Sequence, residues 1–539
     1  MLPLLLAFSI NAQEKLVESI EIHVVNVDVV VTDRAGNPVP NLKREDFELY
    51  ENGKPQTITN FYEVRPDDLD APRTAATAAQ PAREEVPPPE ARARHVVIFI
   101  DDYSVEPLAR AHLIQSLTKF VDNNLRDGDS ASVVSWSRAA HVLVPFTTDR
   151  AALKAAINAI QPRGSIQSRM EDNRVRQACT DDARVGGRGR MQARDDCASM
   201  IESRIDEQWS LERDLLRALR LAMVSLGGME GKKAMIIAGS QLPDKPGVDL
   251  YQLYIQLFGG RTAMHPVMMA SSRSQTLSIA DVAREANAHG VTLYTIDTND
   301  SRNTTSAENF DPMTNEEAFY EFTNTKAAFD SLAKITGGIS IANTSNLDYA
   351  FDTVARDLTS WYSLGYRPAD DKTTGNRNLR VKVKNPAYRV RTRETYAFKS
   401  HDEEISDKVL ANIVHEGMKS QWPIGLRTGT PKKDGRHFLV PIEVTVPPTV
   451  TLLPAAGNKL TGGFDVYIVV GNDDGQTSNT TKHAQPITIP AGVEKVVRSK
   501  PLTFNATLMV RPGKNTLSIA VVDQTSNVTG FARATIVAH

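Results

Sequence analysis

The stretch from His95 to Ser104 constrains the fold of this chain more than any other. It reads His-Val-Val-Ile-Phe-Ile-Asp-Asp-Tyr-Ser, an unbroken apolar run followed at once by two carboxylates and a hydroxyl. A β-branched run of this kind is typical of a strand buried on both faces, as in a parallel sheet covered by helices. The acidic residues would then lie at the carboxyl edge of the sheet, where open α/β folds place their ligands.

The pattern that follows alternates helices with strands up to about Tyr366. The expected helices are 107–125, 150–160, 209–226, 275–289, 326–335 and 347–359. The expected further strands are 130–136, 141–145, 234–238, 291–297 and 339–342. Strands that alternate with helices predict a parallel sheet with right-handed crossovers, and therefore a doubly wound α/β domain.

A chain of 539 residues is too long for one hydrophobic core, so we expect about three domains. The predicted division is a signal peptide 1–12, an N-terminal β module 17–64, a Pro/Ala linker 65–94, an α/β domain 95–366 with an insertion 163–206, an antiparallel β extension 367–400, and a C-terminal β-sandwich 401–539. Asn52-Gly53, between two alternating apolar runs, predicts a hairpin turn in the β module. A module this small buries little surface, so we expect it to pack on another domain.

The first residues, MLPLLLAFSINA, resemble the apolar region and cleavage site of a secretory signal peptide, although no basic residue precedes them. The alternative is a disordered or buried N-terminus. No later stretch reaches the roughly 18 apolar residues needed to span a bilayer. A net charge of −3 gives no general attraction to nucleic acid or anionic membrane.

The segment 163–206 interrupts the α/β pattern as an irregular insertion with nearly balanced arginines and carboxylates. Balanced charge favours a solvated surface over a nucleic-acid patch. The segment holds the only two cysteines, Cys179 and Cys197. In an exported chain they would pair, and the alternative is two free thiols.

The order of these elements resembles a von Willebrand factor A (VWFA) domain, and more closely the VWFA-related proteins of Acidobacteria and neighbouring soil bacteria. The residues that carry the resemblance are 29–39, 46–53, 100–104, 290–297, 336–338 and 362–366. The resemblance covers roughly residues 17 to 396. It implies the fold and export, and it implies no particular biochemical activity.

A typical domain of this family binds a divalent cation through an Asp-x-Ser-x-Ser turn, a Thr from a second loop and an Asp from a third. Here Asp101 matches the first Asp, and Asp102 and Ser104 lie beside it, but Tyr103 and Val105 replace the two hydroxyls. The insertion replaces the second loop. Gly239-Ser240 follows the strand after which the third Asp is expected. We therefore expect no functional Mg²⁺ site, with Asp101 and Asp102 acting as structural caps.

Signatures of enzymes are missing from the sequence. Ser240 lacks the Gly-x-Ser-x-Gly elbow of serine hydrolases, and no phosphate loop or dinucleotide fingerprint follows a strand. The sequence favours an exported, non-enzymatic protein-binding or scaffold protein without a cofactor, secreted or held in the cell envelope, with a protein as its partner. The alternative is an envelope hydrolase that uses Asp101 and Asp102 at the acidic strand end.

Overall fold

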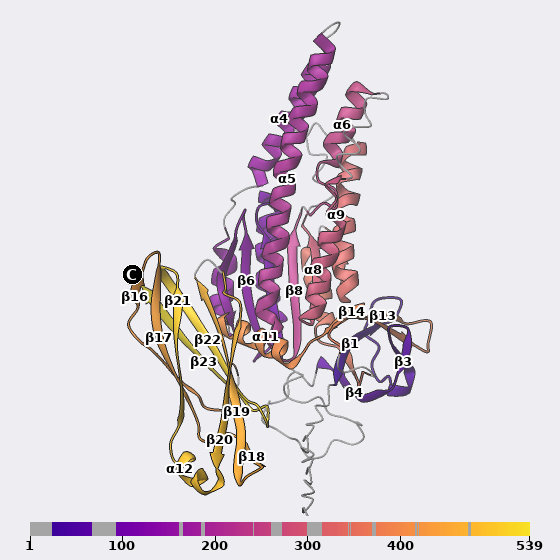
Figure 1. Ribbon diagram of the computed structural model, residues 1–539. Helices are drawn as coiled ribbons and strands as arrows, with labels where there is room; N and C mark the ends of the chain where they lie inside the picture. Colours follow the sequence, from indigo (N-terminus) through magenta and orange to yellow (C-terminus); the bar gives the residue numbers. More distant parts are fainter. Residues whose placement is uncertain are drawn as a thin grey trace, which may run out of the picture.

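The computed structural model describes residues 24–66, 93–160, 165–184, 189–240, 242–259, 272–298, 315–342, 344, 346–368, 373–414, 418, 420–472 and 476–539. Figure 1 shows an α/β domain with long helices that rise beyond its sheet. Two β-rich parts lie near the opposite end of that sheet. The predicted signal peptide and nearly all of the predicted linker lie outside the described residues.

The α/β domain is built on a six-stranded sheet of order β10-β9-β8-β5-β6-β7. Its strands are β5 (Arg94–Asp101), β6 (Ser130–Trp136), β7 (Ala140–Thr147), β8 (Lys232–Gly239), β9 (Val291–Asp297) and β10 (Ser340–Ile341). Neighbouring strands run parallel except β7, which pairs antiparallel with β6. The predicted α/β class with a parallel sheet is confirmed. The chain order reverses between β5 and β8, so the switch point of the sheet lies there.

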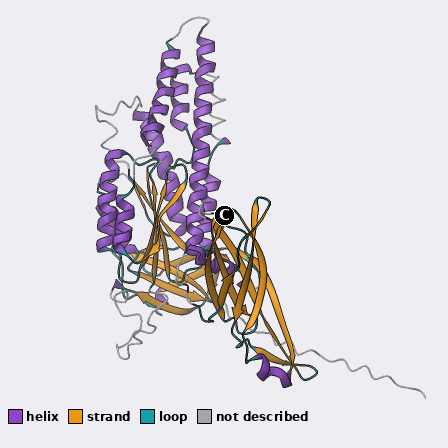
Figure 2. Cartoon of the chain, turned by 90° about the vertical axis from the view of Figure 1, so that its left-hand side faces the viewer, coloured by secondary structure: helices purple, strands orange, loops and turns teal. Residues whose placement is uncertain are grey.

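Helices cover both faces of this sheet, as Figure 2 shows from the side. The helices are α2 (Pro107–Asn123), α3 (Arg150–Asn158), α5 (Gly189–Gly227), α6 (Val248–Phe258), α8 (Thr276–Ala288), α9 (Asn315–Thr336) and α10 (Leu347–Asp357). On one face α2, α3 and α10 pack on Val96, Ile98 and Ile100 of β5. On the other face α5, α8 and α9 pack on Val97 and Phe99. The unbroken apolar run of β5 is needed because both of its faces are covered.

The predicted insertion is a helical hairpin, so the expectation of an irregular segment was wrong. Helix α4 (Ser165–Ala183) runs beside the first half of α5, whose 39 residues span about 58 Å. The two helices rise from the α/β domain in Figure 1. The mixed charge hid the helices because their buried arginines pair with carboxylates of neighbouring helices, as Arg204 does with Asp172 at 2.6 Å.

The N-terminal strands do not form a unit of their own. They are β1 (Val25–Thr32), β2 (Phe47–Glu51), β3 (Lys54–Gln56) and β4 (Ile58–Val64). They pair with strands from more than 300 residues later, namely β11 (Trp361–Tyr366), β12 (Gly375–Val383), β13 (Arg389–Arg391) and β14 (Thr395–Phe398). The two sheets have the orders β13-β1-β11-β4 and β14-β12-β2-β3 and share one core. The turn at Asn52-Gly53 joins β2 to β3 with positive φ at both residues, as predicted.

The predicted domain boundary at Tyr366 is corrected by this pairing. Strand β11 lies between β1 and β4 and makes no pair with the parallel sheet. All of its residues are buried, because one face points into the shared core and Trp361 points the other way, into a cluster with Val30 and Val64. The boundary was misplaced because β1 and β4, the pairing partners of β11, lie far earlier in the chain.

The C-terminal part holds helix α11 (His401–Val414) and two antiparallel sheets. Its strands are β15 (Gly425–Thr428), β16 (Lys432–Asp434), β17 (His437–Val446), β18 (Leu452–Ala455), β19 (Lys459–Asn472), β20 (Thr481–Pro490), β21 (Leu502–Val510), β22 (Gly513–Asp523) and β23 (Thr529–Ala538), with the short helix α12 (Glu494–Val497) before β21. The sheets share one apolar core. Helix α11 packs Ile405 and Val409 on Tyr467 and Val469 of β19. No helix in the described part of the chain is both long and apolar enough to cross a bilayer.

Candidate functional site

The residues singled out from the sequence lie where β5 ends, at the switch point of the sheet. Strand β5 ends at Asp101, and a tight turn carries Asp102, Tyr103 and Ser104 toward α2. All four side chains are buried. The strand is fixed between β6 and β8, so the position of the turn is set by the sheet and not by the turn sequence.

Asp102 is bound to a cation of its own chain. The Arg110 guanidinium donates from Nε to Asp102 Oδ1 at 2.9 Å, and its Nη2 lies 2.7 Å from the same oxygen. Nη2 also donates to the carbonyl oxygens of Asp102 and Val105. Removal of either charge would leave the other buried and unpaired, which is strongly destabilising. Asp102 therefore ties the turn to α2.

Asp101 belongs to a chain of hydrogen bonds that joins three strand ends. The Ser104 hydroxyl donates to Asp101 Oδ2 at 2.6 Å and accepts from the Ser240 backbone N–H at 2.8 Å. The Ser240 and Thr298 hydroxyls lie 2.6 Å apart. Burial raises the pKa of Asp101 to about 7, although the hydrogen bonds from Ser104 oppose this shift. Gly239-Ser240 stands where the family pattern places its third Asp. In the structure this segment binds the β5 turn directly.

Tyr103 has a packing role at the position where the family pattern expects a hydroxyl. Its ring lies edge-on to Trp136 with the ring centroids 5.7 Å apart, and Arg138 lies over its other side. Val105, at the second hydroxyl position, is fully buried in the core beneath α2. The two replacements are therefore parts of the hydrophobic core and contribute no oxygen to the strand end.

Glu212 of α5 is the residue that the sequence did not indicate. It is 8% exposed, and its Oε2 has no hydrogen-bond partner. Burial, with a smaller contribution from Asp244, raises the pKa of Glu212 well above its usual value. Glu212 and Asp101 line the same cavity, which has a volume of about 70 Å³. A single carboxylate in a helix with many charged residues does not stand out in the sequence, because its burial depends on how α5 crosses the sheet.

The residues at this strand end do not fit a Mg²⁺ site. Mg²⁺ requires near-octahedral coordination by oxygens, with carboxylates to offset the loss of its water. Asp102 is already neutralised by Arg110, and the hydroxyls of Ser240 and Thr298 bind each other. Across the described residues, His, Cys, Asp and Glu side chains form no group of three or more that could hold a metal ion.

The cysteines of the insertion form a disulfide, as predicted. Cys179 of α4 and Cys197 of α5 have Cα atoms 5.0 Å apart. Both are fully buried against Leu250 and Tyr254 of α6. Arg176 adds an ion pair from α4 to Asp249 of α6. The helices beyond the sheet are therefore a cross-linked, packed structure; α4, α5 and α6 are called the helical projection below.

No protein-family model and no curated protein matches this chain. Among solved structures, an aerotolerance-related membrane protein from Bacteroides fragilis is 13% identical, covers 49% of this chain and 98% of its own, and has a TM-score of 0.23. BatB from Bacteroides thetaiotaomicron is 12% identical, covers 49% of this chain and 98% of its own, and has a TM-score of 0.23. The vWF domain of the type V pili tip protein Mfa5 from Porphyromonas gingivalis is 14% identical, covers 49% of this chain and 95% of its own, and has a TM-score of 0.26.

Identities of 12–14% and TM-scores of 0.23–0.26 assign neither a family nor a function to this chain.

Proposed function

We propose that this protein is an exported, non-enzymatic protein-binding or scaffold protein whose α/β domain presents the helical projection to a partner. The observation that carries the proposal is the size of the cavity at the switch point. It measures about 70 Å³, whereas sites for small molecules occupy roughly 300–1,000 Å³. Side chains of α5 and α9 and the loop before α6 fill the edge where an α/β enzyme keeps its substrate pocket.

The alternative, a hydrolase acting through Asp101 and Asp102, receives less support. Asp101 does meet a second polar group, since Ser104 Oγ lies 2.6 Å away. That hydroxyl also accepts a hydrogen bond from the backbone of Ser240, and Asp101 is only 3% exposed. A nucleophile or base must reach the bond that it attacks, and this pair has no room for a substrate.

Export is supported by the disulfide, because such bonds persist in oxidising compartments such as the periplasm or the cell exterior. A secreted or envelope location also agrees with the apolar segment at residues 1–12, although that segment lies outside the described residues. Metal independence is the other part of the proposal. It follows from the ion pair between Asp102 and Arg110, which removes a carboxylate from the metal position.

The projection is the part of the domain best placed to meet a partner. It extends away from both β-rich parts in Figure 1. Met191, near its far end on α5, is 67% exposed. An exposed Met can adapt its shape to an apolar partner surface.

Site-specific photo-cross-linking in the full chain tests this function. A photoreactive residue replaces Met191 in one variant and Met509 of β21, which is 62% exposed, in the control. Both variants are incubated with the envelope fraction of the source cell, with and without EDTA. We expect one saturable protein adduct from position 191, unchanged by EDTA, and none from position 509. Equal adducts from both positions, or loss of the adduct in EDTA, would contradict the proposal.

A further inference from the structure

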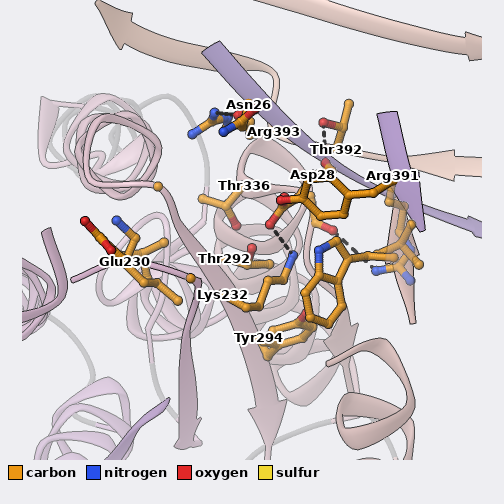
Figure 3. A pocket seen from close by; sticks show the side chains of 18 of the residues that line it. Asn26, Asp28, Glu230, Lys232, Thr292, Tyr294, Thr336, Arg391, Thr392 and Arg393 are labelled. Carbon is orange, nitrogen blue, oxygen red and sulfur yellow. Dashed lines mark hydrogen bonds and ion pairs between the residues drawn. The ribbon is translucent and has the colours of Figure 1, made fainter. Parts of the chain in front are cut away.

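A second cavity lies at the opposite edge of the parallel sheet from Asp101. A cavity of about 780 Å³ separates the amino ends of β8 and β9 from the outer face of β1 and β11. Figure 3 shows side chains from both parts pointing into it, with Asn26 and Asp28 on one side and Lys232 and Thr292 on the other.

The period of two in β1 explains why polar side chains reach this cavity. Val27, Val29 and Val31 point into the core shared with β11. The alternate residues, among them Asn26 and Asp28, point outward and line the cavity. The polar half of the β1 pattern is therefore directed at the α/β domain and not at bulk solvent.

Two of the four cations at the cavity are neutralised. Lys232 Nζ lies 3.1 Å from Asp28 Oδ2, and the ammonium group also lies over the Trp361 ring. Arg391 Nη1 donates to Asp357 Oδ2 at 3.0 Å. These pairs join the β-rich part to the α/β domain. The second cavity carboxylate, Glu230, is exposed at the rim.

The other two cations, Lys233 and Arg393, both lie beside Gly290. Lys233 Nζ lies 3.4 Å, and Arg393 Nη1 3.6 Å, from the point that a Cβ on Gly290 would occupy. Among the described residues neither cation has a carboxylate within 4.0 Å, and Arg393 Nε is buried with no hydrogen-bond partner. Within the described part of the chain, Lys233 Nζ donates to the carbonyl oxygen of Gly227 at 3.3 Å, and Arg393 Nη2 donates to the carbonyl oxygen of Asn26.

The electrostatics of Lys233 agree with this geometry. Burial, and then the charges of Arg393 and Lys399, lower the pKa of Lys233 to about 8. Lys399 itself is paired with Asp407. Like charges gathered in a partly buried site are unfavourable unless an anion offsets them.

We propose that this cavity binds a small organic anion through a phosphate group held between Lys233 and Arg393. The guanidinium fork suits a tetrahedral oxyanion, and the lysine adds a point charge beside it. The volume falls within the roughly 300–1,000 Å³ of small-molecule sites and exceeds what a bare oxyanion needs. Tyr62 in the wall, which is only partly buried, offers ring surface to the organic portion.

Isothermal titration calorimetry of the full chain with phenyl phosphate and with inorganic phosphate tests the site. We expect saturable binding of both, with phenyl phosphate at least about tenfold tighter because it also contacts the ring of Tyr62. Lys233→Gln and Arg393→Gln should each weaken phenyl phosphate at least tenfold, since each removes a charged hydrogen bond. Arg389→Gln is the matched control, because Arg389 lies on β13 near Arg391 but does not line the cavity.

Folding of the variants is followed by the melting temperature without ligand, and Arg393→Lys keeps the charge if Arg393→Gln fails to fold. Absence of saturable heat with both anions at 10 mM, or equal binding by Lys233→Gln and Arg389→Gln, would overturn the proposal. Equal affinity for the two anions would keep the phosphate contact and overturn the organic portion of the ligand.

Discussion

Ionisation of Asp101 should make the α/β domain less stable as the pH rises, and the substitution Asp101→Asn should remove this dependence. The folded-state pKa of Asp101 is about 7, against about 3.9 in an unfolded chain. The folded state therefore holds its proton more tightly. The associated stability is complete below about pH 4 and is lost as the pH rises through 7.

The size of the effect follows from the pKa difference. Three units correspond to about 4 kcal/mol between pH 4 and pH 8, an order-of-magnitude value for a fully buried group. Asparagine has the shape of the protonated acid and can still accept from Ser104, at a cost of about 1 kcal/mol for altered hydrogen bonds. We expect wild type and the variant to be about equally stable at pH 4.5, where wild type has lost about 1 kcal/mol, and the variant to be the more stable by about 3 kcal/mol at pH 8.

Hydrogen exchange of the β5 segment 96–100 is the appropriate assay, because a chain with several cores does not unfold in one step. Opening free energies of wild type and Asp101→Asn are compared at pH 4.5, 6 and 8. Asp127→Asn, whose side chain is fully exposed, is the control and should follow wild type. Parallel curves for wild type and Asp101→Asn, or a wild type that gains stability relative to the variant as the pH rises, would refute the reasoning.

Magnesium provides a second arm of the same experiment. A bound cation would keep Asp101 ionised and abolish the difference between wild type and variant at pH 8. We expect 10 mM MgCl₂ to leave that difference unchanged.

Three further predictions concern the cross-link and the split β-rich part. Denatured, unreduced protein should show no titratable thiol, and two reactive thiols would contradict the pairing. The double variant Cys179→Ser, Cys197→Ser should have a local opening free energy of α4 that is lower by about 3 kcal/mol, with no change in β5. Leu364→Ala, at a fully buried position in β11, should destabilise the core that it shares with β1 by about 2–5 kcal/mol in hydrogen exchange. Leu453→Ala, at a partly exposed site, should cost under about 1 kcal/mol. Cleavage within residues 67–92 should leave residues 24–66 bound to the rest on size-exclusion chromatography, because β1 and β4 pair with β11; a released, folded fragment would contradict this.

The sequence by itself determined the features that depend on near neighbours in the chain. The apolar run of β5 required burial on both faces, and the structure covers both with helices. Asn52-Gly53 determined a hairpin turn because both residues tolerate positive φ. The two cysteines, 18 positions apart, were close enough in sequence for their pairing to be predicted. Local patterning controls these features, since periodicity and turn chemistry act within a few residues.

Tertiary structure alone decided which elements meet. Only long-range pairing shows that β11 belongs to the sheet that contains β1 and β4. Glu212 became part of the cavity beside Asp101 through the path of α5 across the sheet. Lys233 and Arg393 lie far apart in the sequence, and only the fold places both beside Gly290. The periodicity of apolar residues indicates whether a side chain is buried. The element that buries it is determined by the packing of the whole chain.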